Sequence, residues 1–305
     1  MPFIALNELR QIAICPRCGM SLGWTDEHLA ICSTCAISYD PVGRWPVLVD
    51  ESQSLLDATR LRLGHGASSL ERRMTQTKRS PAYLRQVRAN VDRFVAALEA
   101  GDRVLVVGGG ENAHQLGRLY DEPSITIVGF DLYASELTQF VADAHQIPLA
   151  DASVDGVVVQ AVLEHVLQPD QVVAEIHRVL KPSGIVYAET AFLQAVHEGP
   201  FDFGRFTELG HRWLFRAFIE IEAGAIGGPG LQAVWAADYL SRGLFRSRRA
   251  GLRARRLAMV LNGLDRFIPR AFRVDAAPAV YFMGRRSDTE LDRHSLVARY
   301  RGAQT

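Results

Sequence analysis

The stretch that decides the fold is Val104-Leu-Val-Val-Gly-Gly-Gly-Glu-Asn112. Its four consecutive branched apolar residues predict a strand that is buried on both faces of a sheet. The next three residues, Gly108, Gly109 and Gly110, let the backbone turn sharply where side chains would obstruct a ligand. We expect a helix directly after this turn, because a strand, a glycine turn and a helix N-terminus in that order are typical of a nucleotide site.

A second apolar segment, residues 124–130, ends at Asp131. A carboxylate roughly 20 residues beyond a glycine turn is placed to bind ribose hydroxyls in folds of this kind. The two segments together predict a cofactor that contains adenosine, held across the carboxyl ends of the first two strands.

The alternation of elements continues along the chain. Apolar residues at helical spacing mark helices at 81–98 and 172–179, and apolar runs at 153–159 and 185–189 predict buried strands. The strands expected last are 219–222 and 279–283. We therefore expect an α/β fold with a doubly wound, Rossmann-like sheet of seven strands.

These motifs resemble class I S-adenosylmethionine-dependent methyltransferases of the broad type 11 group, over residues 104–189. The resemblance rests on the order of the glycine turn, Gly129-Phe-Asp131, Asp143-Ala144, Leu163-Glu-His-Val166 and Arg178-Val-Leu-Lys-Pro-Ser-Gly184. It implies an enzyme that transfers a methyl group from S-adenosylmethionine to an O or N acceptor. The acceptor itself is not indicated by the sequence.

The resemblance also implies which residues bind the cofactor. The glycine turn would flank its methionine and ribose part, Asp131 would bind the ribose hydroxyls, and Asp143 and Ala144 would border the adenine. Gln160 would lie where a strand meets the methyl-transfer cleft. The predicted cofactor-binding residues are Gly108, Gly109, Gly110, Glu111, Asp131, Leu132, Asp143, Ala144 and Gln160.

Two positions depart from the family pattern. Val106 stands where the family usually has an acidic residue that helps to hold the aminoacyl end of the cofactor, and Asn112 stands where it has a further glycine. A non-catalytic cofactor- or partner-binding module is therefore one alternative. An NAD-binding Rossmann protein is another, because Gly108-x-Gly110-x-x-Ala113 followed by an acid fits the dinucleotide fingerprint. The block at 143–184 favours the methyltransferase.

His165 and His197 are the predicted catalytic residues. Transfer of a methyl group to a hydroxyl or an amine requires a group that takes up the acceptor's proton, and histidine is suited to this role. His197 lies in a segment of mixed aromatic and charged residues, 196–207, which predicts a substrate-facing loop. The alternatives are a structural role for His165 at the start of a helix and a buried structural loop at 196–207.

All four cysteines lie near the N-terminus, as Cys15-Pro-Arg-Cys18 and Cys32-Ser-Thr-Cys35, with 13 residues between the pairs. Two such loops can converge on one tetrahedral zinc ion, whose role would be structural because four cysteines leave no open coordination position. Two disulfides or four unliganded thiols are the alternatives. Residues 12–50 resemble the zinc-ribbon module of the activator subunit that partners tRNA and protein methyltransferases.

Residues 241–273 hold ten arginines and one acidic residue, Asp265. Apolar residues at helical spacing run through the same segment from Leu257 to Ile268. Three interpretations are open: a solvated helix packed on the core, an interfacial helix that meets anionic lipid, or an RNA-binding surface. The acceptor is accordingly expected among small or lipid-linked molecules, RNA and proteins.

The composition sets the remaining expectations. The 305 residues include 34 Lys and Arg against 34 Asp and Glu, so only a local patch can attract nucleic acid or membranes. No apolar run approaches the roughly 20 residues that span a bilayer, and we expect a cytoplasmic protein. The expected domains are a zinc-ribbon-like module at 1–50, a linker at 51–80, a methyltransferase domain at 81–286 with an Arg-rich helical insertion at 241–273, and a C-terminal tail at 287–305.

Overall fold

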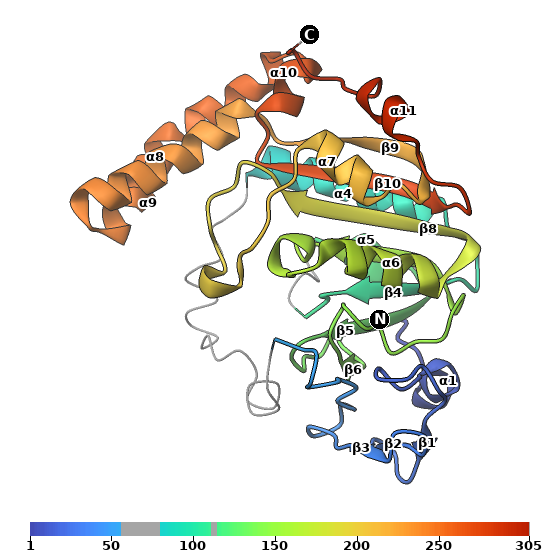
Figure 1. Cartoon of the computed structure of the whole chain (residues 1–305). Coiled ribbons are helices and arrows are strands. Elements are labelled where there is room, and N and C mark those ends of the chain that lie inside the picture. Colours follow the sequence, from blue (N-terminus) through green and yellow to red (C-terminus); the bar gives the residue numbers. More distant parts are fainter. Residues whose placement is uncertain (56–79, 111–114, 305) are drawn as a thin grey trace.

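The computed structural model describes residues 1–55, 80–110 and 115–304. Seven strands form one sheet in the order β6-β5-β4-β7-β8-β10-β9 (Figure 1). They are β4 (Arg103–Val107), β5 (Thr126–Asp131), β6 (Phe140–Val141), β7 (Val154–Gln160), β8 (Leu180–Ala191), β9 (Phe218–Ile226) and β10 (Ala279–Arg286). Neighbouring strands are parallel from β6 to β8, whereas β10 is antiparallel to both β8 and β9. The predicted Rossmann-like sheet of seven strands is confirmed, and β10 makes it a mixed sheet.

The carboxyl ends of β4, β5, β6 and β7 meet at one edge of the sheet. Val107 at the end of β4 lies opposite Phe130 and Val159, and Asp131 lies opposite Val141. We call this edge the rim, and it comprises the segments that follow the four strands: 108–110, 131–133, 142–145 and 160–166. The register therefore gathers most of the predicted cofactor residues at one place.

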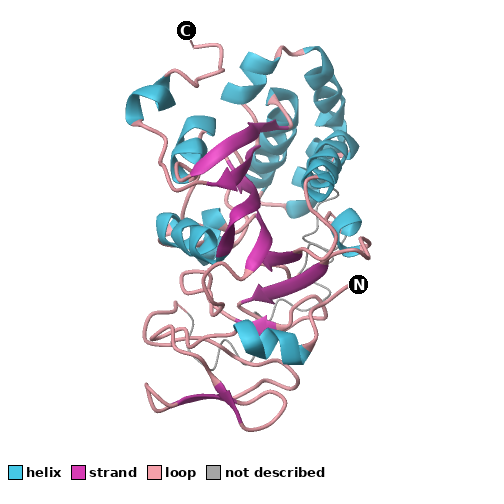
Figure 2. Cartoon of the chain, turned by 90° about the vertical axis from the view of Figure 1, so that its right-hand side faces the viewer, coloured by secondary structure: helices cyan, strands magenta, loops and turns pink. Residues whose placement is uncertain are grey.

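Helices cover both faces of the sheet (Figure 2). On one face, α6 (Pro169–Val179) and α7 (Glu208–Leu214) pack on a large apolar cluster. On the other face, a second apolar cluster contains side chains of α4 (Pro81–Ala96), α5 (Gly117–Tyr120) and the first turn of α8 (Pro229–Phe245). The sheet is thus buried on both sides, which explains the uninterrupted valine runs of its central strands.

Helix α4 shows how the sequence directs these elements. Ser80 caps the helix by accepting a hydrogen bond from the Tyr83 N–H at 3.2 Å, and Pro81 occupies the first helical position. Val87, Val91 and Phe94, spaced by four and three residues, are fully buried against the sheet. The predicted helix at 81–98 is confirmed within two residues.

The helix expected directly after the glycine turn is different in the structure. Residues 111–114 lie outside the described residues, and α5 begins only at Gly117 and has four residues. Leu116 and Leu119 are nevertheless buried in the predicted way. A helix of this length offers little dipole to a ligand, so the glycine turn itself and Asp131 matter more at the rim.

The N-terminal residues form a small module of α1 (Leu6–Ile12) and a three-stranded antiparallel sheet of β1 (Gly23–Trp24), β2 (Ala30–Cys32) and β3 (Ile37–Tyr39). In Figure 1 this module, in blue, lies beside β6 and β5. Its buried side chains, Cys15, Ala30 and Cys32 among them, belong to the same apolar cluster as the central strands of the main sheet.

Backbone hydrogen bonds attach this module to β5, to β6 and to the segment after β6. Ile4 donates to the carbonyl of Ile127 in β5 at 2.9 Å, and Ile14 donates to the carbonyl of Pro148 at 3.0 Å. Leu48 donates to the carbonyl of Val141 at 2.8 Å, and Val141 donates to that of Pro46 at 2.9 Å. Residues 46–48 thereby pair with β6 and cover the edge of the sheet.

The C-terminal third contains a long helical hairpin. After β9 the chain forms α8, α9 (Arg248–Asn262), η3 (Gly263–Phe267) and α10 (Arg270–Asp275) before it returns as β10. Figure 1 shows α8 and α9 side by side and projecting away from the sheet. The tail with α11 (Arg293–Val297) folds back, and the Tyr300 hydroxyl donates to Asp275 at 2.8 Å. Among the described residues, every helix is too short or too polar to cross a membrane.

Candidate functional site at the rim of the sheet

The glycine turn and Asp131 are in direct contact at the rim. Gly110 donates its backbone N–H to Oδ2 of Asp131 at 2.9 Å, and Leu132 donates to Oδ1 at 2.7 Å. Gly108 has a φ of +69°, and a Cβ built on it would lie 2.3 Å from Cγ2 of Val162. A side chain at Gly108 would therefore strain the backbone and collide with the segment after β7.

Asp143 lies at the next position along the rim and is nearly buried. Its carboxylate accepts the ring Nδ1 of His145 at 2.6 Å and the hydroxyl of Ser54 at 2.7 Å. Burial alone would raise the pKa of Asp143, but these hydrogen bonds hold it below its usual range. Ala144 beside it is buried as well. Ser54 belongs to the polar segment after the cysteine module, and nothing in its sequence context points to a contact with the rim.

Gln160 ends β7 in a buried polar network. Its Nε2 donates to Glu189 at 2.5 Å and to Gln115 at 3.3 Å, and Tyr187 also hydrogen-bonds Glu189. The carbonyl oxygen Oε1 of Gln160 is buried and has no hydrogen-bond partner among the described residues. A buried acceptor without a partner costs free energy, so Gln160 is suited to receive a hydrogen bond from a ligand. Sequence reasoning gave no role to Glu189.

The two predicted catalytic histidines lie together. His165 ends η1 (Leu163–His165), which follows β7, and His197 lies in the loop after β8. Their Nε2 atoms are 3.1 Å apart, although 32 residues separate them in the sequence. The structure thus brings His165 and His197 into contact at the rim, while their catalytic role stays a prediction.

The hydrogen bonds of the two rings define their protonation. Nδ1 of His165 is 2.7 Å from the carbonyl of Phe201, and Nδ1 of His197 is 3.2 Å from that of Ala195. Because a carbonyl only accepts, each Nδ1 carries a hydrogen, and in the neutral pair each Nε2 presents a lone pair. Burial lowers the pKa of His165, and the positive charge that His197 can carry lowers it further. Two facing lone pairs at this separation attract one proton.

The surroundings of the pair hold His197 in place. Asp202 accepts the backbone N–H of His197 at 2.8 Å and forms an ion pair with Arg205. Burial would raise the pKa of Asp202, but the hydrogen bonds from Arg205 and His197 keep it well below its usual range. Asp202 therefore stays ionised and orients the loop, a role that its position between two phenylalanines in the sequence did not indicate.

Glu164 lies beside the pair and is 1% exposed. One of its oxygens accepts the Ala191 N–H at 3.3 Å, and the other has no hydrogen-bond partner in the described part of the chain. Burial raises the pKa of Glu164 to about 7. A carboxylate oxygen of Glu164 and one nitrogen from each histidine lie within 4.8 Å of one another, so the three groups form one acid–base cluster.

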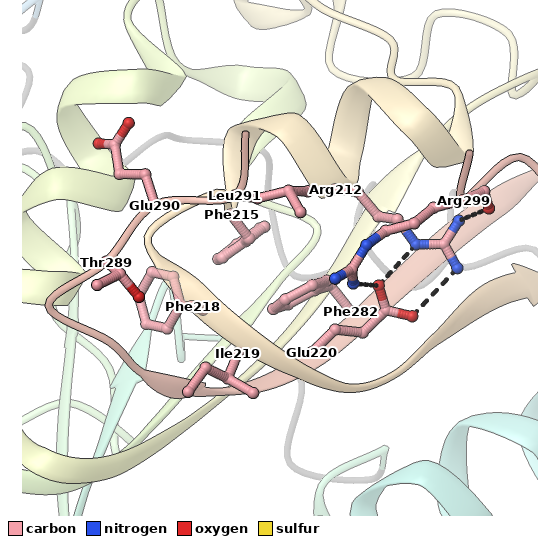
Figure 3. Close-up of a pocket in the computed structure, with 10 residues that line it drawn as sticks. All are labelled: Arg212, Phe215, Phe218, Ile219, Glu220, Phe282, Thr289, Glu290, Leu291 and Arg299. Atoms are coloured by element: carbon pink, nitrogen blue, oxygen red, sulfur yellow. Dashed lines mark hydrogen bonds and ion pairs between the residues drawn. The ribbon is translucent and has the colours of Figure 1, made fainter. Parts of the chain in front are cut away.

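A pocket of about 210 Å³ lies elsewhere, between α7, β9, β10 and the C-terminal tail (Figure 3). The buried guanidinium of Arg212 pairs with Glu208 at 2.7 Å and Glu220 at 2.8 Å, and Arg299 pairs with Glu220 at 3.2 Å. These charges satisfy one another, so the network joins the tail to α7 and β9. No residue predicted for catalysis or cofactor binding lines this pocket.

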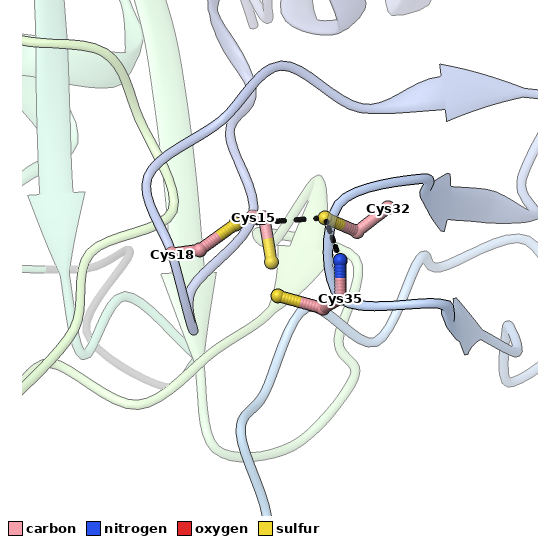
Figure 4. Close-up of side chains that lie close together, drawn as sticks. All are labelled: Cys15, Cys18, Cys32 and Cys35. Atoms are coloured by element: carbon pink, nitrogen blue, oxygen red, sulfur yellow. Dashed lines mark hydrogen bonds between the residues drawn. The ribbon is translucent and has the colours of Figure 1, made fainter.

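The four cysteines converge as the sequence predicts (Figure 4). The Sγ atoms of Cys15, Cys18, Cys32 and Cys35 all lie within 4.8 Å of one another, and none of the four forms a disulfide. Sγ of Cys18 and Cys32 are 3.5 Å apart, and the Cys35 N–H donates to Sγ of Cys32 at 3.4 Å. This arrangement is compatible with a single tetrahedral metal ion.

Two predicted positions add little to this geometry. Leu132 is half-buried and packs on the small apolar cluster that contains Val141. Glu111, and with it Asn112, lies outside the described residues.

Comparison with known proteins adds the class of domain. Residues 105–188 match the family model described as "Methyltransferase domain". The match begins in β4, ends in β8 and includes the whole rim. The chain therefore carries a methyltransferase domain built around the rim. No curated protein matches the chain in sequence.

Several solved structures are similar to the chain. One is a complex between the Haloferax volcanii Trm112 methyltransferase activator and the putative methyltransferase, with 19% identity, a TM-score of 0.46 and coverage of 69% of this chain and 92% of that chain. Another is Burkholderia thailandensis 1,6-didemethyltoxoflavin-N1-methyltransferase with bound 1,6-didemethyltoxoflavin and S-adenosylhomocysteine, with 15% identity, a TM-score of 0.45 and coverage of 88% and 99%. A SAM-dependent methyltransferase from Archaeoglobus fulgidus has 14% identity, a TM-score of 0.44 and coverage of 67% and 94%.

Proposed function

We propose that the protein is an S-adenosylmethionine-dependent methyltransferase that acts on an O or N acceptor. The observation that carries the proposal is the contact between Gly110 and Asp131, 2.9 Å, at the rim of a methyltransferase domain. This contact places a carboxylate and a turn without side chains at the carboxyl ends of adjacent strands, where α/β folds bind nucleosides.

The residues at the rim fit this cofactor. Oε1 of Gln160 is a buried acceptor without a partner among the described residues, and an ammonium group would supply its missing hydrogen bond. Gly108 and Gly110 leave no room for side chains, since Cβ atoms there would collide with Val162 and the ring of Tyr133. These glycines therefore let Val162 and the ring of Tyr133 pack directly on the backbone of the turn.

The proposed contacts follow the order of the strands. The turn at Gly108, Gly109 and Gly110, with Glu111, would hold the methionine and ribose part, and Asp131 would accept hydrogen bonds from the ribose hydroxyls. Leu132, Asp143 and Ala144 would border the adenine, and Gln160 would face the amino acid end. When bound, S-adenosylmethionine supplies a methyl group carried on a positively charged sulfur.

The histidine pair supplies the acid–base chemistry in this proposal. A hydroxyl or amine acceptor must lose a proton as it gains the methyl group. The facing Nε2 atoms of His165 and His197 take up that proton and share it as an N–H···N hydrogen bond. Burial keeps His165 neutral at neutral pH, so the pair is ready to accept the proton.

A specific observation favours a second candidate, a non-catalytic binding module. Val106, at the position where the family has an acidic residue, is buried in the apolar layer that contains α4 side chains. The missing charge-assisted hydrogen bond would weaken cofactor binding by roughly 1.5–3 kcal/mol. Calorimetry with S-adenosylmethionine and S-adenosylhomocysteine separates the two candidates, because an active enzyme must bind at least one of them.

The matched variants for this titration are Asp131→Asn and Asp121→Asn. Asp131→Asn removes the charge at the rim and should weaken binding roughly 10- to 100-fold, whereas Asp121, exposed after α5, should have no effect. Absence of heat with both compounds would refute the enzyme. Heat with NAD instead would favour the dinucleotide-binding alternative.

We also propose that the four cysteines hold a structural zinc ion. The supporting observations are the four convergent sulfur atoms and the lack of a disulfide among them. In the proposed domain organisation, residues 1–50 form the zinc module, 81–286 the methyltransferase domain with its helical insertion at 241–273, and 287–305 the tail. Metal analysis of the purified chain and of a Cys18→Ser, Cys35→Ser variant tests the zinc.

A further inference from the structure

The helical hairpin of α8 and α9 is held together along one line of contact. A Cβ on Gly251 would lie 2.2 Å from Oδ1 of Asp238, and a Cβ on Gly230 would lie 2.2 Å from the carbonyl oxygen of Leu261. The two helices therefore approach closely at these glycines. Asp238, nearly buried between them, forms an ion pair with Arg242 at 3.0 Å. Close packing and this ion pair therefore join α8 to α9 along the hairpin.

Large apolar side chains on this hairpin are unusually exposed. The exposed fractions of five of them lie between 65% and 81%, whereas the side chains that face the sheet are buried. The five are Leu240, Leu244, Phe245, Leu257 and Val260. Such a concentration of exposed apolar surface on one element is typical of an interaction site.

Four leucines of the hairpin, two from each helix, share one face. Asp238 of α8 and Gly251 of α9 face each other, and Leu244 and Leu257 each lie six residues beyond them. At about 100° per residue, six residues rotate both side chains by the same angle, about 120° from the line of contact. Because the helices are antiparallel and face each other, advancing the same number of residues along each helix turns the two side chains toward the same side of the hairpin. Leu240 and Leu261 fall within about 40° of these directions.

Exposed arginines border this apolar face. Arg246 lies in the connection between the helices, and Arg249, Arg253 and Arg256 are exposed along α9. Residues 241–273 contain ten arginines and a single acidic residue, Asp265, whose carboxylate accepts the backbone N–H groups of Gly230 and Leu231. The hairpin therefore presents apolar side chains next to a net positive charge.

We propose that the α8–α9 hairpin binds the surface of an anionic lipid bilayer. Its apolar face enters the boundary between headgroups and acyl chains, and its arginines pair with lipid phosphates. A second copy of the chain is disfavoured as the occupant, because two hairpins would bring like charges together. Nucleic acid would use the arginines but leave the leucines in water. The combination of the two kinds of residue selects the lipid surface.

The lipid-binding face is distinct from the side that touches the catalytic loop. Tyr239, one residue beyond Asp238, points about 140° away from the direction of Leu244, and its hydroxyl donates to the carbonyl of Val196 at 2.6 Å. Val196 precedes His197. Docking on a bilayer thus leaves the contact between α8 and the catalytic loop intact. The proposal concerns binding alone and does not depend on the methyltransferase activity.

Cosedimentation of the full chain with vesicles tests the proposal. With phosphatidylcholine vesicles that contain about a third phosphatidylglycerol, we expect at least tenfold more bound protein than with phosphatidylcholine alone, and a large decrease in high salt. Leu244→Ser with Leu257→Ser, and separately Arg249→Glu with Arg253→Glu, should each reduce binding at least fivefold. Val297→Ser is the matched control, because Val297 is 70% exposed on α11, and it should bind like the parent.

Each of the other outcomes overturns the proposal. Equal binding to both kinds of vesicle would refute the attraction of the arginines to anionic lipid, and binding that the leucine variant retains would refute insertion of the apolar face. Absence of vesicle binding together with binding to RNA that needs only the arginines would assign the surface to nucleic acid. Absence of vesicle binding together with a dimer in light scattering that the leucine variant dissociates would assign it to a second copy.

Discussion

The carboxyl group of Glu164 gives a direct test of the electrostatics at the rim. It is buried beside the histidine pair, and burial raises its pKa from an ordinary value of roughly 4.3 to about 7. Because the pKa is higher in the folded state, the protonated carboxyl contributes its full stability only below the unfolded pKa. That contribution is lost as the pH rises through about 7.

Glu164→Gln removes the charge and keeps the shape of the side chain. A rise of the Glu164 pKa from roughly 4.3 to about 7 corresponds to a penalty of about 3–4 kcal/mol at pH values above both pKa values. The variant does not bear this penalty. We therefore expect its free energy of unfolding, relative to the parent, to increase by about 2 kcal/mol between about pH 5.5 and about pH 8.5.

Urea unfolding followed by tryptophan fluorescence at the two pH values measures this difference. The matched control is Glu136→Gln, because Glu136 is largely exposed and its ion pair with Arg44 lies at the surface. A relative stability of Glu164→Gln that stays constant or falls between the two pH values would show that the folded protein stabilises the negative charge. Burial would then not raise the pKa of Glu164.

Three other outcomes can be measured on the same protein. If the histidine pair takes up the acceptor's proton, His165→Gln should lower kcat roughly 100- to 10,000-fold without changing the Kd for S-adenosylmethionine. The parent should lose activity on acidification only below the ordinary histidine pKa of roughly 6.5. Full activity of the variant would exclude this role. Gly108→Ala should destabilise the fold by about 1–3 kcal/mol. Adding Val162→Ala should restore the part of that stability that is lost through the collision with Val162. An unfolding curve of Gly108→Ala that equals the parent's would contradict the strained geometry. Ser54→Ala should cost about 1–3 kcal/mol in stability, and calorimetry should also register weaker cofactor binding if Asp143 borders the adenine.

The sequence was most informative where local pattern and global fold agree. The valine runs of β4 and β7 predicted buried parallel strands, and the spacing of Val87, Val91 and Phe94 predicted α4 because periodicity depends only on the backbone geometry. The rim followed from topology alone, since parallel strands end at the same edge. For the same reason, His165 and His197 could be assigned to one end of the sheet although they are distant in the sequence.

Other features depend on contacts that no local pattern encodes. The hydrogen bond from Ser54 to Asp143 joins two segments separated by 89 residues, and a lone serine in a polar segment carries no signal for it. The network of Glu189 with Gln160 arises because neighbouring strands place them side by side. The exposed position of the α8–α9 hairpin was likewise not decided by its sequence, because an amphipathic helix looks the same whether its apolar face meets the core or another surface.

The pairing of residues 46–48 with β6 has a practical consequence for anyone who trims this protein. A shorter version that begins at the methyltransferase domain would lose the strand segment that pairs with Val141, together with the residues that hydrogen-bond Ile127 in β5. The exposed backbone would then be open to pairing with other molecules. Such a fragment should aggregate rather than behave as a self-sufficient enzyme.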